Sequence, residues 1–307
     1  MQAPSSRAAV SVFTAWNAQE LAPSHLSLIR DALEALGGET AAPVWLDERV
    51  AAEIPVDGLS FEQAQAAARM ALGDAPFDVV AQPADGRRKR LLVADMDSTI
   101  LTGETLDELA DHAGLKDKVA RITELAMNGE LDFEGALRER VAMLKGLPET
   151  SLEETWKGVE YTPGARTAIR TLSALGVRCL LVSGGFRFFT ARVAEECGFA
   201  GHVANDLEIE NGVLTGQVKG AIVDRSVKLS TLKDEAAGLG LPLDACASIG
   251  DGANDLPMIK AAGLGVAFHA KPSVAREARA IVTHGDLRSL LYLQGIPRSE
   301  WVDAGEA

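Results

Sequence analysis

The chain alternates short apolar stretches with longer segments in which apolar residues recur at helical spacing. From residue 163 onward this pattern predicts strands over 177–182, 246–249, 265–268 and 280–282, and helices over 165–175, 187–197, 225–239, 256–262 and 274–279. An Asn-Gly pair inside 207–218 predicts an antiparallel hairpin. Near-continuous apolar strands joined by helices are typical of a parallel sheet covered on both faces. We therefore expect an α/β fold with a doubly wound parallel sheet.

Residues 1–85 show a different pattern and are expected to form a domain of their own. Strand-like and helical stretches follow one another in the order βαββαβ, which predicts a ferredoxin-like α+β sandwich. The unit resembles the ACT-like domains that precede some amino-acid enzymes. Proline and glycine within 82–86 indicate the boundary, so the second domain spans 86–307. A packing module, or one that joins two copies in a homodimer, is its simplest role.

A charged, helical segment over about 103–160 interrupts the strand and helix alternation directly after the apolar strand 91–94. Its four predicted helices cover 104–113, 116–127, 132–144 and 152–159. A bundle inserted at this point would lie over the end of the strand. We expect a helical cap.

The composition and charge of the chain argue against several classes of protein. The 307 residues carry a net charge of −14, which argues against a nucleic-acid or anionic-membrane binder. No apolar run reaches the ~20 residues needed to span a bilayer, and the first residues lack a signal-peptide core. Three widely spaced cysteines indicate neither a disulfide framework nor a zinc site. We expect a soluble, cytoplasmic protein.

Three predicted strands end in polar clusters. Asp95 and Asp97 follow the strand 91–94, Ser183-Gly184-Gly185 follows the strand 177–182, and Asp251 with Asn254 and Asp255 follows the strand 246–249. In a doubly wound sheet ligands bind outside the carboxyl ends of the strands, so these clusters can converge. Carboxylates that meet need positive charge between them, and Mg²⁺ with its preference for oxygen ligands fits.

The middle cluster has the chemistry of a phosphate site. The Ser183 hydroxyl can donate a hydrogen bond, and the two glycines allow backbone N–H groups to approach an anion before a helix begins. Lys228, on a later predicted helix, can add a compact positive charge. The residues alone also allow simpler interpretations, in which Ser183 is a helix cap and Lys228 a solvated lysine.

These residues together resemble a known family. The segments 95–99, 181–185, Lys228 and 250–255 are similar, in order and spacing, to the four motifs of the haloacid dehalogenase-like phosphohydrolases. The cap segments 104–108, 126–129, 131–133 and 137–141 resemble those of the phosphoserine phosphatases, a branch of that family. The resemblance extends from residue 90 to about 293.

The resemblance implies a mechanism. Asp95 would attack phosphorus and form an aspartyl-phosphate, and Asp97 would act as general acid and then general base. Mg²⁺ would be held by Asp95, Asp251 and the backbone carbonyl of Asp97. Asp255 would orient Lys228 or metal-bound water.

The resemblance also implies how a substrate binds. Phosphate oxygens would be held by Ser183, Gly184, Lys228 and Asn254. In O-phospho-L-serine, Glu104 would bind the ammonium group and Arg140 the carboxylate. Met127 and Phe133 would form apolar walls. The expected reaction is hydrolysis of O-phosphoserine to serine and phosphate, the last step of serine biosynthesis.

Two alternative functions remain open at this stage. The first is a phosphatase or phosphotransferase acting on another small phosphomonoester. The second is an amino-acid sensor whose phosphatase half has lost its activity. Glu104 and Arg140 would also suit a surface ion pair, while Met127 and Phe133 would suit the interior of the helical bundle. A dehalogenase is disfavoured, because Asp97 supplies an acid for an alkoxide leaving group that dehalogenation does not need.

Overall fold

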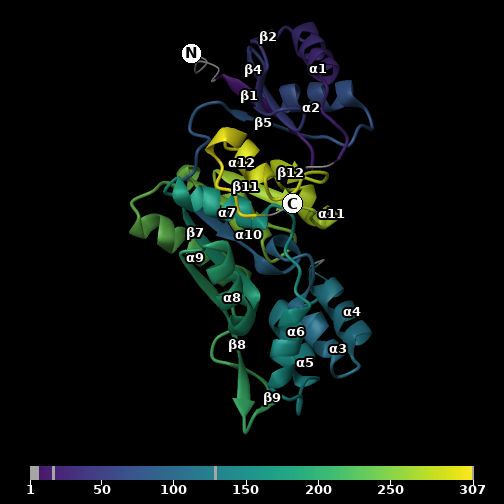
Figure 1. Cartoon of the computed structure of the whole chain (residues 1–307), viewed down its shortest axis with the longest axis vertical. Coiled ribbons are helices and arrows are strands. Elements are labelled where there is room, and N and C mark those ends of the chain that lie inside the picture. Colours follow the sequence, from purple (N-terminus) through teal and green to yellow (C-terminus); the bar gives the residue numbers. More distant parts are fainter. Residues whose placement is uncertain (1–6, 16–17, 128–129, 306–307) are drawn as a thin grey trace.

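The structure is a computed structural model that describes residues 7–15, 18–127 and 130–305, with the backbone alone at Met127. A five-stranded sheet lies at the top of Figure 1, a seven-stranded sheet in the middle, and a group of helices at the bottom. None of the helices in these residues has the length and apolar character that crossing a bilayer requires. The predicted α/β fold with an additional N-terminal α+β unit is confirmed.

The N-terminal sheet is antiparallel, with the strand order β2-β4-β1-β5 and with β3 also paired to β4. Its elements are β1 (Ala8–Phe13), α1 (Pro23–Ala35), β2 (Glu39–Thr40), β3 (Val44–Asp47), β4 (Ala51–Asp57), α2 (Phe61–Leu72) and β5 (Asp78–Pro83). Helix α2 begins after Ser60, whose hydroxyl accepts a hydrogen bond from the Gln63 backbone amide at 3.2 Å. The sequence did not predict strand β2, because a strand of two residues is too short to show an alternation of apolar and polar positions.

Alternate residues of β1 contribute to two different cores. Val10 and Val12 pack with helices α1 and α2, which cover one face of the N-terminal sheet. Phe13 belongs to the core of the rest of the molecule, where its ring lies 6.1 Å from that of Tyr292. The N-terminal sheet is therefore buried on both faces, against its own helices and against the C-terminal segment.

The seven-stranded sheet, called here the main sheet, has the order β12-β11-β10-β6-β7-β8-β9. Neighbouring strands are parallel except for the antiparallel pair β8–β9. Its strands are β6 (Leu91–Ala94), β7 (Arg178–Phe186), β8 (Gly201–Glu210), β9 (Val213–Lys219), β10 (Cys246–Gly250), β11 (Leu264–Phe268) and β12 (Ala280–Val282). Strand β6 occupies the middle of the sheet, so the residues that follow it lie between the ends of β10 and β7.

Helices cover both faces of the main sheet. Leu92 and Ala94 share a core with α7, α8 and α12, whereas Leu91 and Val93 share a core with α9 and α10. This burial on two sides explains why β6 is apolar at every position. The elements are α7 (Ala165–Ala174), α8 (Arg187–Cys197), α9 (Arg225–Gly238), η2 (Leu243–Ala245), α10 (Leu256–Ala261), α11 (Pro272–Ala275), α12 (Ser289–Tyr292) and η3 (Arg298–Glu300).

Helix α11 differs from the prediction for 274–279. It starts two residues earlier, with Pro272 as its first residue, and ends at Ala275. The chain must then reach Ala280, which pairs with Val266 at the start of β12. The register of the sheet therefore ends the helix sooner than its sequence would.

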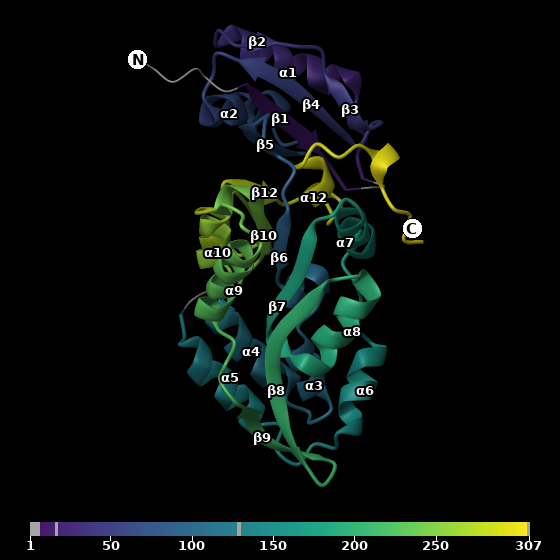
Figure 2. The same ribbon diagram turned by 90° about the vertical axis from the view of Figure 1, so that its left-hand side faces the viewer.

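Four helices between β6 and α7 form the cap. After the turn η1 (Met96–Ile100) they are α3 (Thr105–Asp111), α4 (Lys116–Met127), α5 (Phe133–Ala142) and α6 (Thr150–Lys157). At one end the entering and leaving chains are paired, since the Thr102 amide donates to the Glu160 carbonyl at 3.0 Å. At the other end Leu214 of β9 exchanges backbone hydrogen bonds of 2.8 Å with Gly146 and Leu147. The cap is thus held to the main sheet at two places (Figures 1 and 2).

A buried carboxylate joins the N-terminal sheet to the main sheet. Asp78, the first residue of β5, is only 2% exposed. Its oxygens accept hydrogen bonds from the backbone amides of Thr283 at 2.9 Å, His284 at 2.9 Å and Gly285 at 2.7 Å. Charge-assisted hydrogen bonds of this kind are stronger than neutral ones.

We expect the Asp78→Ala variant to lose about 2–4 kcal/mol of folding free energy, because three backbone N–H groups lose their acceptor. Denaturant unfolding monitored by circular dichroism measures the change. The matched control is Asp57→Ala, which removes an exposed ion pair with Arg7 and should cost no more than about 1 kcal/mol. Equal losses in the two variants would contradict the importance assigned to Asp78.

Candidate active site

The polar residues that follow β6 are buried at the carboxyl end of the central strand. Asp95 is 2% and Asp97 6% exposed. The Asp95 amide donates to the Ile249 carbonyl of β10 at 3.1 Å, which continues the sheet by one residue. The chain then turns sharply, and Ser98 adopts a left-handed conformation with φ of 54°. This turn lets both carboxylates reach the same region although they are two residues apart.

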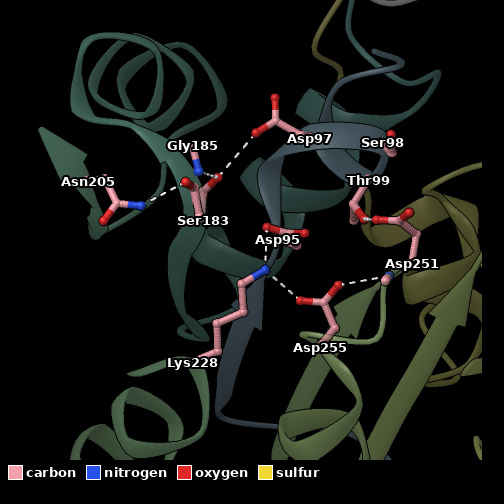
Figure 3. Close-up of polar contacts among 12 residues, drawn as sticks. Asp95, Asp97, Ser98, Thr99, Ser183, Gly185, Asn205, Lys228, Asp251 and Asp255 are labelled. Carbon is pink, nitrogen blue, oxygen red and sulfur yellow. Dashed lines mark hydrogen bonds and ion pairs between the residues drawn. The ribbon is translucent and has the colours of Figure 1, made fainter. Parts of the chain in front are cut away.

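The end of β7 lies against Asp97. The Ser183 hydroxyl donates to one Asp97 oxygen at 3.3 Å and accepts from the Gly185 amide at 2.8 Å (Figure 3). The Thr105 backbone amide donates to the other Asp97 oxygen at 2.8 Å. A Cβ atom at Gly185 would lie 2.7 Å from an Asp97 oxygen, so no larger residue fits there without displacing it. Burial raises the pKa of Asp97, and its hydrogen bonds from Thr105 and Ser183 only partly offset this. A raised pKa suits a carboxyl group that must carry a proton.

Lys228 of α9 connects the first and last polar clusters. Its ammonium group lies 2.6 Å from an oxygen of Asp95 and 2.6 Å from an oxygen of Asp255, and its side chain is 1% exposed. Burial by itself lowers the pKa of Lys228, but Asp255 and Asp95 outweigh that effect and the pKa is raised. The second Asp255 oxygen accepts from the Gly252 amide at 3.0 Å. Asp255 thus holds Lys228 against Asp95 (Figure 3).

Three buried carboxylates form a group that fits a cation. Oxygens of Asp95, Asp251 and Asp255 lie within 4.8 Å of one another, and these side chains are 3% exposed or less. Within the described residues Lys228 is the sole cation paired with them, so negative charge is in excess. Burial and the Asp255 carboxylate raise the pKa of Asp95, with Lys228 opposing them. Burial followed by Asp255 raises the pKa of Asp251 to about 7. Oxygen donors and excess charge favour a hard divalent cation.

A cavity lies between this site and the cap. Its walls come from the ends of the sheet strands and from α3, α4 and α5, and they comprise Asp95, Asp97, Glu104, Leu106, Thr123, Ala126, Phe133, Leu137, Arg140, Ser183, Gly184, Gly185 and Asn254. The Asn254 side-chain oxygen is buried in this region and, in the part of the chain that the structure describes, has no hydrogen-bond partner. An unsatisfied polar atom at a cavity wall is available to a ligand or to water.

The cap supplies one half-buried carboxyl group and one buried guanidinium group to the cavity. Glu104 accepts a 2.6 Å hydrogen bond from the Ser98 hydroxyl. Burial and the Asp97 carboxylate raise its pKa to about 8. Arg140 is 5% exposed, which is unusual for an arginine. The surface ion pair considered from sequence is wrong for both residues.

Phe133 closes the cavity over the end of β7. A Cβ atom at Gly184 would lie 2.6 Å from the tip of the Phe133 ring, so the glycine allows this close packing. Phe133 is therefore a wall of the cavity, while also packing at the edge of the core. Met127 ends helix α4, but its side chain lies outside the described residues.

Sequence reasoning missed two residues that shape the site. Asn205 of β8 donates to the Gly184 carbonyl at 2.7 Å and accepts from the Val223 amide at 2.8 Å, which fixes the end of β7 (Figure 3). Thr123 of α4 lines the cavity beside Arg140. Neither residue belongs to a local motif, and only their long-range contacts reveal them.

Comparisons with known proteins point to one family. A family model described as haloacid dehalogenase-like hydrolase matches residues 92–260. The phosphoserine phosphatase SerB2 of Mycobacterium tuberculosis is 48% identical over 221 residues, covering 72% of this chain and 54% of that protein. The phosphoserine phosphatase of Streptococcus thermophilus is 48% identical over 205 residues, covering 67% of this chain and 95% of that protein. The chain spans between half and two thirds of the length of several curated relatives.

Solved structures agree with these relatives. A substrate-bound phosphoserine phosphatase complex is 39% identical, with a TM-score of 0.64, and covers 66% of this chain and 97% of its own. A haloacid dehalogenase family hydrolase from Salmonella enterica is 28% identical, with a TM-score of 0.79, and covers 94% of this chain and 98% of its own. The second match includes the N-terminal sheet. This chain therefore shares both of its sheets with a known structure.

The carboxylate group predicts a pH-dependent affinity for divalent cations. Since the pKa of Asp251 is about 7, the acid is protonated below that pH, and a cation must displace the proton. We expect the affinity for a hard divalent cation to rise about tenfold between about pH 6 and about pH 8. Calorimetry in two buffers of different ionisation enthalpy measures both the affinity and the released proton. An affinity that does not change with pH would contradict the prediction.

Proposed function

This chain belongs to the haloacid dehalogenase-like hydrolase family, and we propose that it is a Mg²⁺-dependent phosphatase that hydrolyses O-phospho-L-serine to L-serine and phosphate. One observation carries the proposal: a single cavity has Asp95 and Asp97 on one side and Glu104 and Arg140 on the other. The names of the relatives support the same substrate. Release of L-serine would make this reaction the last step of serine biosynthesis.

Asp95 would be the nucleophile. A carboxylate oxygen of Asp95 attacks phosphorus, the bond from phosphorus to the serine oxygen breaks, and Asp97 transfers its proton to that oxygen. In the second step Asp97 takes a proton from water, the water oxygen bonds to phosphorus, and the bond to Asp95 breaks. The raised pKa of Asp97 supports the first role, because burial shifts this carboxyl group toward its protonated form.

The phosphoryl group would be held by the ends of β7 and α9. Ser183 and Gly184 line the cavity beside the carboxylates, and the side-chain NH2 group of Asn254 at the cavity wall can donate to a phosphate oxygen. A lysine ammonium has three N–H bonds, of which Lys228 uses two on Asp95 and Asp255. No other hydrogen-bond partner of the Lys228 ammonium group is found among the described residues, so the third N–H would be available to a phosphate oxygen.

Mg²⁺ would be held by Asp95, Asp251 and the backbone carbonyl of Asp97, and when bound it would neutralise charge on the transferring phosphoryl group. Asp255 has a different role in this proposal, because its two oxygens already accept hydrogen bonds from Lys228 and the Gly252 amide. It would position Lys228 and the neighbouring ligands.

Substrate choice would depend on the cap. Arg140 is a buried cation with no carboxylate within ion-pair distance among the described residues, so a substrate carboxylate would supply its partner. Glu104 faces the same cavity and would bind the ammonium group. Phe133, together with Met127, would exclude water. A homodimer through the N-terminal unit stays a prediction.

We expect Asp95→Asn to lower the rate of phosphate release from O-phosphoserine roughly a thousandfold or more, because an amide is not a competent nucleophile. The wild type should release phosphate with Mg²⁺ and not after its removal by a chelator. The control is Asp244→Asn at an exposed position, which should leave the rate unchanged. An Asp95→Asn protein with wild-type turnover would overturn the mechanism.

Arg140→Ala tests the substrate. We expect kcat/KM for O-phosphoserine to fall roughly a hundredfold and that for an aryl phosphate to change little, because the lost contact is to the carboxylate. Arg138→Ala, on the same helix but exposed and paired with Glu134, is the matched control and should leave both rates intact. Equal losses on both substrates after Arg140→Ala would favour another small phosphomonoester as the substrate.

A further inference from the structure

We propose that Asp107 and Thr123 are positioning residues that orient Arg140 toward the carboxylate of the substrate. The inference rests on the proposed function, since it concerns how the cap recognises that carboxylate. Asp107 lies on α3, Thr123 on α4 and Arg140 on α5, so the contact joins three cap helices. Their exposed fractions are 8%, 4% and 5%.

The three side chains form a continuous chain of hydrogen bonds. The Thr123 hydroxyl donates to an Asp107 carboxylate oxygen at 2.6 Å. The same hydroxyl accepts from Nη1 of Arg140 at 2.7 Å. The Val119 carbonyl, at 3.2 Å, is a second acceptor for the hydroxyl proton, but the Asp107 oxygen is nearer and carries charge. Donation to Asp107 turns the lone pairs of the hydroxyl toward Arg140.

The remaining N–H groups of Arg140 stay free for a ligand. A guanidinium group has five N–H bonds. Nε donates to the Ala136 carbonyl at 3.1 Å and one Nη1 proton goes to Thr123, and within the described residues no other hydrogen bond of Arg140 is found. Three N–H bonds are left. Since Arg140 lines the cavity, they are available to a carboxylate there.

An acid in direct contact with Arg140 would not serve this purpose. A carboxylate paired to the guanidinium through two parallel hydrogen bonds would occupy the groups that a substrate carboxylate needs. Thr123 separates the two charges, so Asp107 stabilises the buried cation from a distance and leaves those groups free. Thr123 lines the cavity and Asp107 does not, which fits a pair that acts through Arg140.

The position of Asp107 also connects recognition of the substrate carboxylate with recognition of the substrate ammonium group. Glu104 precedes the first residue of α3, and Asp107 follows three residues later in the first turn of that helix. The first turn of α3 therefore carries both the acid proposed for the substrate ammonium and the acid that orients Arg140. A shift of this turn would move Glu104 and Asp107 together.

The test compares two substrates that differ only in the carboxylate: O-phosphoserine and O-phosphoethanolamine. In Thr123→Val, which keeps the shape and loses the hydroxyl, we expect kcat/KM for O-phosphoserine to fall about tenfold, mainly through a higher KM. The value for O-phosphoethanolamine should stay within about twofold of the wild type. Thr123→Ser restores the hydroxyl and should recover the wild-type preference.

Thr155→Val is the matched control. Thr155 is a buried cap threonine, 5% exposed, whose hydroxyl donates to the Ser151 carbonyl at 2.8 Å and which does not line the cavity. It should not change the ratio of the two kcat/KM values. Equal losses on both substrates in Thr123→Val, or an unchanged ratio, would overturn the proposed positioning role. A wild-type protein that does not prefer O-phosphoserine would instead disprove the proposed function, and this inference with it.

Discussion

The ammonium group of Lys228, held between Asp95 and Asp255, is the interaction on which the site depends. It joins a residue after β6, a helix that follows the hairpin, and a residue after β10, all buried. Asp95, Asp251 and Asp255 place three carboxylates within 4.8 Å of one another in a region that water barely reaches. The ammonium group of Lys228 offsets part of their negative charge. Repulsion between buried like charges is costly unless protons or cations relieve it. The main sheet brings these groups together because its parallel strands all end at one edge.

The cap completes the cavity that the sheet alone leaves open. It is held at one end by the paired chains at Thr102 and Glu160, and at the other by the contact of Leu214 with residues 146–147. The ring of Phe133 lies against Gly184, which directly joins the cap to the end of β7. In the proposed mechanism, the sheet carries the groups that bind a phosphate and the cap carries the groups that bind an amino acid. The proposal therefore assigns catalysis and specificity to separate elements that meet across one cavity.

Local patterns in the sequence predicted most elements and the three polar clusters. Ser60 caps α2, and Asn211 and Gly212 form the turn between β8 and β9 with φ angles of 51° and 78°. Both are local signals, in which neighbouring residues determine the backbone. The strands that precede Asp95 and Asp251 were also predicted from local pattern, because burial on both faces leaves almost no polar position along them.

Local patterns did not predict contacts between residues that are far apart in the sequence. Asp78 has the sequence context of an ordinary strand start, yet it accepts hydrogen bonds from three backbone amides of residues 205 or more positions further along the chain. Asn205 and Thr123 likewise act through partners that no period or spacing reveals. The role of Phe13 and Tyr292 in joining the two sheets depends on how the C-terminal segment packs. These features follow from tertiary packing, which one sequence does not encode locally.

The central claim is that Asp95 becomes phosphorylated during turnover. Acid quenching of the enzyme within the first turnovers on O-phosphoserine, followed by mass spectrometry of the peptide that contains Asp95, tests it directly. We expect a peptide heavier by one phosphoryl group, with the modification on Asp95 and dependent on Mg²⁺. Steady phosphate release from a protein whose Asp95 peptide never carries a phosphoryl group, under quench conditions that preserve acyl phosphates, would contradict it.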